Sequence, residues 1–259
     1  MGFRNNNTGY TSQPLSTRAI VKRGNYALLV PDGLVKNMIP GFEYSDVTIL
    51  SSPKLGASFV DYLVTADEQG RNREGFGGDG IETFLYLLQG KLEVSAGEQV
   101  FHLEQGGFVF CPPDRKLYWQ AHTPCEFFLY KRRYRPIGKE LPQTVCSRIA
   151  DLVPAAYEGM EDVILYDLLP KTMDYDMNFH ILSFRPGACH GYIETHVQEH
   201  GALILSGEGM YRLDDIWTPV QKGDYIFMGA YSPQAAYGIG REEAFTYLYS
   251  KDCNRDEEI

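Results

Sequence analysis

The stretch HGYIETHVQEHGALILSGEG, residues 190–209, decides the fold and carries the candidate site. Glu194 and His196 are two residues apart, so on an extended strand their side chains point to the same side. His200 follows across a bend or at the start of the next strand. The apolar run after it ends at Gly207, which is typical of a strand closed by a glycine turn. The block therefore predicts one carboxylate and two imidazoles at the entrance of an apolar β-strand.

The first half of the chain repeats this pattern. Gly90 and Gly207 are 117 residues apart, as are Gly106 and Gly223. An internal repeat of β-rich segments indicates a duplicated domain. Three pairs of segments match in order: GIETFLYLLQGKLEV (80–94) with QEHGALILSGEGMYRL (198–213), LEQGGFVFCPP (103–113) with VQKGDYIFMGA (220–230), and FFLYKRRY (127–134) with TYLYSKDCNR (246–255).

The repeat predicts an all-β bicupin, with two jelly-roll (double-stranded β-helix) barrels in tandem. Short strands separated by glycine turns are typical of such barrels, and small barrels bind ligands in their interior. We expect an N-terminal cupin barrel in residues 1–145 and a C-terminal, metal-binding catalytic barrel in residues 146–259. The segment LPQTVCSRIADLVPAAY (141–157) is expected to be a short helical linker.

A fourth metal ligand is expected from a later strand of the second barrel, where GDYIFMGAYSPQAAYG offers Gln234. Imidazole and carboxylate ligands suit Mn, Fe, Zn, Co or Ni, and an amide oxygen favours Mn or another hard ion. The alternative is a hydrogen-bonded polar cluster without metal. The predicted metal ligands are Glu194, His196, His200 and Gln234.

The first barrel provides an internal control for this site. Shifting the four ligand positions back by 117 residues gives Gly77, Asp79, Thr83 and Leu117, of which only Asp79 could bind a metal. The N-terminal barrel is therefore expected to be metal-free.

Composition limits the partners and the compartment. The formal charge of -10 repels phosphate backbones, so nucleic acid is not an expected partner. The five cysteines show no C-x-x-C spacing, which favours reduced thiols. No apolar run is long enough for a signal peptide or a membrane span. We therefore expect a cytoplasmic protein with a small-molecule substrate, no membrane association and a homo-oligomeric state.

At the level of family, residues 180–231, together with NYALLVPDGLVKNMIPGFE, GASFVDYLVT and the ending YSKDCNRD, resemble the (S)-ureidoglycine aminohydrolase family of allantoin (purine) degradation. The resemblance covers essentially the whole chain. It implies hydrolysis of (S)-ureidoglycine to (S)-ureidoglycolate and ammonia with bound Mn(II).

The resemblance also implies roles for individual residues. The family's metal ligands fall on the four residues predicted above. Its substrate-contacting residues fall on Tyr211, Tyr247 and Lys251, with Glu194 and Gln234 touching both metal and substrate, and Glu194 and Lys251 are the implied catalytic groups. The alignment leaves Ser250 as an alternative to Lys251.

Two other functions compete with this interpretation. One is a cupin dioxygenase using iron, whose usual donor set is two histidines and one carboxylate; a fourth ligand at Gln234 argues against it. The other is a small-molecule-binding or storage bicupin without catalysis.

Overall fold

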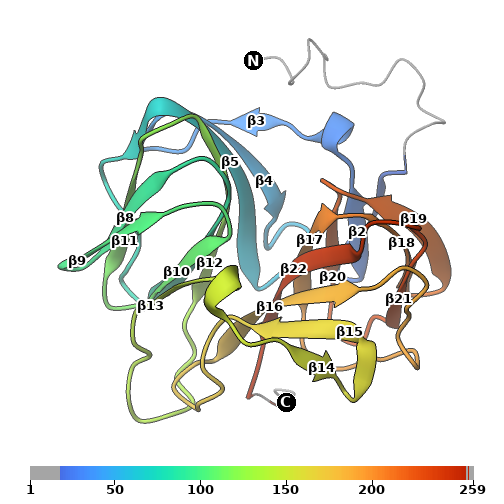
Figure 1. Cartoon of the computed structure of the whole chain (residues 1–259). Coiled ribbons are helices and arrows are strands. Elements are labelled where there is room, and N and C mark those ends of the chain that lie inside the picture. The colour runs from blue at the N-terminus through green and yellow to red at the C-terminus, as the bar shows by residue number, and fades with distance from the viewer. Residues whose placement is uncertain (1–17, 255, 257–259) are drawn as a thin grey trace.

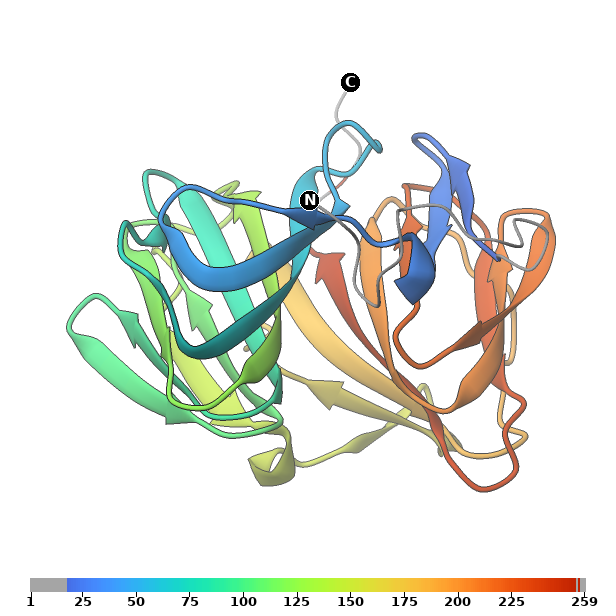
Figure 2. The same ribbon diagram turned by 90° about the horizontal axis from the view of Figure 1, so that it is seen from above.

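The computed structural model describes residues 18–254 and 256 and shows two β-barrels side by side (Figures 1 and 2). Most of the N-terminal stretch in which no signal peptide was expected lies outside the described residues. Within the part that is described, no helix has the length and apolar character needed to cross a membrane.

The first barrel is one antiparallel sheet whose strands differ in length, drawn in blue to green in Figure 1. Its main path runs β13-β10-β7-β12-β5-β11-β8-β9, with β4 added to β5, β3 to β4 and β6 to β11. Its strands are β3 (Lys36–Asn37), β4 (Phe42–Ser51), β5 (Phe59–Asn72), β6 (Phe76–Gly77), β7 (Ile81–Gln89), β8 (Leu92–Ala96), β9 (Gln99–Leu103), β10 (Gly107–Cys111), β11 (Lys116–Ala121), β12 (Cys125–Arg133) and β13 (Val145–Arg148).

The second barrel consists of two sheets. One runs β1-β2-β20-β17-β22-β16-β15-β14, and the other runs β19-β18-β21. Its strands are β1 (Ile20–Lys22), β2 (Tyr26–Leu29), β14 (Ala155–Tyr157), β15 (Met160–Asp167), β16 (Met177–Phe184), β17 (His200–Ser206), β18 (Glu208–Leu213), β19 (Ile216–Gln221), β20 (Tyr225–Met228), β21 (Gln234–Gly238) and β22 (Phe245–Asp252).

The strand order confirms the internal repeat. The path β10-β7-β12-β5 in the first barrel corresponds to β20-β17-β22-β16 in the second. The three matching sequence segments thus occupy equivalent places in two equivalent sheets, as a tandem duplication requires.

The two halves exchange their leading strands. Near the start of the chain, β2 pairs with β20 of the second barrel, with Tyr26 opposite Met228. Near the middle, β13 pairs with β10 of the first barrel, with Ser147 opposite Phe108. The expected division between residues 145 and 146 therefore lies within a strand that is hydrogen-bonded to the first barrel.

The expected helical linker is wrong. Residues 141–157 contain β13, a single 3-10 turn η4 (Ile149–Asp151) and β14; the other 3-10 turn in the described residues is η3 (Pro31–Gly33). Pro142 and Pro154 lack the backbone N–H that a helix needs. The segment pairs with neighbouring strands instead, β13 with β10 and β14 with β15.

The hydrophobic core has three parts. One fills the first barrel, one fills the second, and the third lies between the two barrels. The third part is rich in aromatic rings, and the rings of Phe84 and Phe179 stack across it with centroids 3.7 Å apart. Burying a side chain of this size contributes about 1.5–3 kcal/mol. The packed interface fixes the strands of the second barrel that carry the candidate site.

Candidate metal centre and substrate pocket

The second barrel encloses a small cavity beside β17, β18, β21 and β22. Its volume is about 10 Å³, which suits a single ion or water molecule. The cavity brings together all seven predicted site residues and four others. Its lining is Tyr157, Leu182, Glu194, His196, His200, Tyr211, Met228, Gln234, Tyr247, Tyr249 and Lys251.

The two imidazoles face each other with their Nε2 atoms 3.2 Å apart. The Nδ1 of His200 lies 2.8 Å from the Ser250 carbonyl, and the Nδ1 of His196 lies 3.0 Å from the Gln198 carbonyl. A carbonyl only accepts hydrogen bonds, so both Nδ1 atoms carry the proton and both Nε2 atoms carry a lone pair. Two lone pairs aimed at each other need a cation between them, and this arrangement is typical of metal-binding histidines.

Burial keeps both histidines neutral. It lowers the pKa of His200 well below its ordinary value, and the nearby His196 lowers it further. Burial also lowers the pKa of His196, with Lys251 acting in the same direction. Neutral imidazoles are the form that binds a metal ion.

Gln234 completes a cluster of three side chains. Its Nε2 lies 3.0 Å from the Nε2 of His196, and the Tyr211 hydroxyl donates to its Oε1 at 3.2 Å. The amide oxygen is the atom that would bind a metal, and a hydroxyl can donate or accept, so Tyr211 can partner either orientation of the amide. Nitrogen atoms 3.0–3.2 Å apart match ligands at right angles around one ion with bonds of about 2.1 Å. The side chains present therefore fit a divalent cation.

Glu194 lies at the edge of this cluster. Its backbone exchanges two hydrogen bonds with Gln234, at 2.9 and 3.0 Å, which ties the loop before β17 to β21. Its carboxylate lines the cavity, although its oxygens and the two histidine nitrogens do not all lie within 4.8 Å of one another. Burial raises the pKa of Glu194 and the Glu158 carboxylate adds to this, whereas Lys251 and a hydrogen bond from Tyr157 oppose it.

Side chains of strand β22 point alternately towards the cavity and towards the interface between the barrels. Tyr247 and Lys251 line the cavity, whereas Leu248 belongs to the core between the barrels. Ser250 is buried on the other side, where its hydroxyl accepts from the Gly201 N–H at 3.2 Å. Of the two alternatives for a cationic substrate contact, the structure therefore directs Lys251, and not Ser250, towards the cavity.

Two further tyrosines that line the cavity, Tyr157 and Tyr249, were not among the predicted residues. Tyr249 lies two residues from Tyr247 on β22, and its ring packs against His200 with centroids 5.2 Å apart. Strand alternation could have indicated it. Tyr157 comes from β14, in the segment that was expected to be helical, so its approach to the cavity had no signal in the local sequence.

The first barrel carries Gly77, Asp79, Thr83 and Leu117 at the positions that correspond to the four predicted ligands. Its interior is filled by apolar side chains such as Val94 and Trp119, and Leu117, the counterpart of Gln234, is fully buried among them. Among the described residues of this barrel, three potential ligands are grouped on its outer face.

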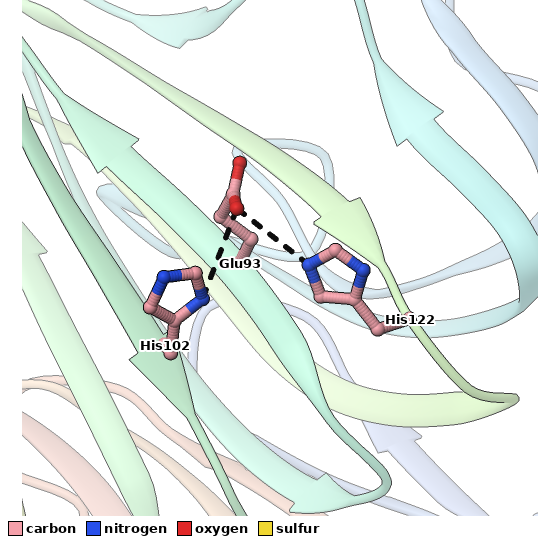
Figure 3. Close-up of side chains that lie close together, drawn as sticks. All are labelled: Glu93, His102 and His122. Carbon is pink, nitrogen blue, oxygen red and sulfur yellow. Dashed lines mark ion pairs between the residues drawn. The ribbon is translucent and has the colours of Figure 1, made fainter.

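That outer face holds a cluster of potential metal ligands formed by Glu93, His102 and His122 (Figure 3). One ligand atom from each residue lies within 4.8 Å of the other two. The cluster was not found from the sequence, because its members are separated along the chain and meet only through strand pairing.

Comparison with known proteins places the chain among relatives along its whole length. It is 62% identical over 262 aligned positions to (S)-ureidoglycine aminohydrolase of Escherichia coli (strain K12), covering 100% of both chains. The chain belongs to the (S)-ureidoglycine aminohydrolase family. The family resemblance predicted from the sequence is thus confirmed.

More distant relatives agree with this membership. The chain is 30% identical to (S)-ureidoglycine aminohydrolase of Arabidopsis thaliana, over 94% of its own length and 80% of the plant protein. Residues 55–134 match the EutQ-like cupin domain family. The crystal structure of protein Ylba from E. coli superimposes with a TM-score of 0.86 and 57% identity, covering 96% of this chain and 100% of the other. The bicupin fold is therefore confirmed.

Proposed function

We propose that this protein hydrolyses (S)-ureidoglycine to (S)-ureidoglycolate and ammonia, with Mn(II) as its cofactor. The observation that carries the proposal is the pair of histidines whose protonated Nδ1 atoms bind carbonyls and whose Nε2 lone pairs converge beside Gln234. Membership of the aminohydrolase family supports the reaction, and the amide ligand supports a hard divalent ion. Glu194, His196, His200 and Gln234 would hold the metal.

A bound divalent ion would supply Lewis-acid chemistry and orient the substrate. The protein supplies charge and hydrogen bonds around it. Lys251 offers an ammonium group for the substrate carboxylate or ureido oxygen, and Tyr211 and Tyr247 offer hydroxyls from β18 and β22. Together these groups would select one enantiomer.

Proton transfer is assigned to Glu194. The reaction breaks the bond between the central carbon and the amine, forms a carbon–oxygen bond from water, and moves one proton from that water to the departing ammonia. Glu194 lines the cavity, and its carboxylate would take the proton from water and give it to the amine. The cavity is ion-sized, so the half-buried side chains of Tyr157 and Lys251 must move when substrate enters.

The roles of the two barrels are part of the same proposal. Residues 146–259, together with β1 and β2, would form the catalytic barrel. The remainder of residues 1–145 would form a barrel whose interior binds no metal, supported by its apolar filling. A cytoplasmic location is supported by five unpaired cysteines. A homo-oligomer is supported by exposed apolar side chains on and beside β3 and β4, such as Met38 at 76% exposure.

The test is an ammonia assay on freshly generated (S)-ureidoglycine, with elemental analysis of protein purified without chelators. Wild-type protein should release ammonia and contain Mn. His196→Ala should lose both metal and activity, whereas Lys251→Met should keep the metal and lose turnover. Ammonia-free turnover with oxygen consumption would instead support an iron dioxygenase, and full activity in His196→Ala would reject the site.

A further inference from the structure

We propose that the outer face of the first barrel carries a second metal site, formed by Glu93, His102 and His122, that binds Zn²⁺ or a similar borderline divalent ion. This site is separate from the cavity of the second barrel and does not depend on the proposed reaction. Residues 1–145 were expected to bind no metal, and with this site that expectation applies only to the interior of their barrel.

Strand register brings the three residues together. Glu93 on β8 lies directly opposite His102 on β9 and, on its other side, opposite Gln120 on β11. His122 directly follows the end of β11, two residues beyond Gln120, and its backbone N–H donates to the carbonyl of Lys91, the residue before β8, at 3.0 Å.

The face in question is the outer one. On β8 the neighbours of Glu93, Leu92 and Val94, are buried in the barrel interior, so Glu93 points away from it. Figure 3 shows both imidazoles turned towards the Glu93 carboxylate from the adjacent strands. Glu93 and His102 thus come from paired strands, and His122 directly follows the end of β11.

The distances suit a shared ion better than direct hydrogen bonds. Both imidazoles approach the same oxygen, Glu93 Oε2, with His102 Nδ1 at 3.7 Å and His122 Nε2 at 3.6 Å. These separations exceed a hydrogen bond. Ligands at about 2.1 Å from one tetrahedral ion are roughly 3.4 Å apart, so small side-chain rotations would complete the site.

The local chemistry also favours a cation. Two imidazoles and one carboxylate form a typical three-residue zinc site with an open fourth position. The side chain of His102 is 74% exposed, so water or a group from another molecule can occupy that position. The neighbouring Lys91 is paired with Glu104 at 3.1 Å, which compensates its positive charge.

The experiment is a Zn²⁺ titration of full-length, chelator-treated protein by calorimetry, with metal content measured after desalting. Wild-type protein should bind two equivalents. The double variant His102→Asn/His122→Asn should bind one, and His196→Ala should bind the other one. The control Glu98→Gln removes an exposed carboxylate from the adjacent β8–β9 turn and should leave two equivalents.

A second readout separates specific binding from weak surface attachment. In the His196→Ala background, Zn²⁺ should raise the melting temperature, because an ion that binds only the folded protein stabilises it. Adding the two outer-face substitutions, His102→Asn and His122→Asn, should abolish that rise. The same stoichiometry in wild-type protein and in the His102→Asn/His122→Asn variant would overturn the proposal. A wild-type stoichiometry of one, lost in His196→Ala, would also overturn it.

Discussion

Arg132 Nη2 lies 3.5 Å from Asp252 Oδ2, and this buried ion pair joins β12 of the first barrel to β22 of the second. The other oxygen of Asp252 accepts from the Glu199 N–H at 2.9 Å, and the Glu199 carboxylate accepts from the Ser58 N–H at 2.8 Å. Asp252 follows Lys251 directly, and Glu199 immediately precedes β17. The first barrel therefore holds β17 and β22, which bring His200 and Lys251 to the cavity.

Replacing Arg132 with Met should destabilise the protein strongly. The substitution keeps most of the side-chain volume but leaves Asp252 and the neighbouring buried acids Glu82 and Asp176 without their cation. Breaking a buried pair in this way costs about 3–5 kcal/mol. Urea denaturation at pH 7 measures the loss. The matched control is Arg133→Met on the exposed side of the same strand, which should change stability by no more than about 0.5 kcal/mol. Equal effects from the two substitutions would contradict a special role for Arg132.

Asp61 should make stability depend on pH. It is fully buried between the barrels with the Tyr225 hydroxyl donating at 2.5 Å, and burial raises its pKa from 3.8 to about 8. The folded state thus keeps a proton that the unfolded state loses above pH 4. The free energy of unfolding should therefore fall as pH rises from about 4 to about 8, by about 1.4 kcal/mol per pH unit.

Asp61→Asn should remove this contribution and flatten the slope. Urea denaturation between pH 5 and pH 8 compares the variant with wild type. Exposed Asp162→Asn on β15 is the control and should retain the wild-type slope. An unchanged slope in Asp61→Asn would show that the carboxyl group is already ionised when folded.

Gly201 should not tolerate a side chain. A Cβ at this position would lie 2.0 Å from Asp61 Oδ2 and 2.5 Å from the Tyr225 hydroxyl. Gly201→Ala must displace β17 and with it His200, and such overpacking costs about 1–3 kcal/mol. Thermal melting and metal content should both decrease. The control is Gly191→Ala, where the nearest atom to an added Cβ is Met160 Sδ at 3.9 Å; a comparable loss there would argue against the steric explanation.

Tyr157 should contribute to turnover without holding the metal. Its hydroxyl hydrogen-bonds to Glu194 and lowers the pKa of that carboxyl, so Tyr157→Phe alters the proposed proton carrier. Hydrogen bonds to charged groups are worth about 1.5–3 kcal/mol, which corresponds to at least about a tenfold loss in kcat/KM. The pH profile of kcat/KM should shift to higher pH, and metal content should stay unchanged. Tyr237→Phe, on the exposed side of the strand that carries Gln234, should have wild-type kinetics. If the two variants behave alike, Tyr157 has no role in the reaction.

The sequence by itself determined the features that depend on neighbours along the chain. The glycine turns and the offset of 117 residues predict strands, a duplication and one ligand-bearing barrel. The candidate ligands followed from this local pattern. The extended strand expected for Glu194 and His196 is wrong, because both residues lie in the loop before β17. Only family resemblance, and not spacing, indicated Tyr211, Tyr247 and Lys251.

Only the tertiary structure decided the features that depend on strand pairing between distant segments. Local sequence favoured a helical linker, but the free edges of β10 and β15 bound its residues and brought Tyr157 to the cavity. Arg132 reaches Asp252, 120 residues away, and Glu93 meets His122 through the same physical cause. Hydrogen-bond register between strands sets these contacts, and no local pattern in the chain specifies that register.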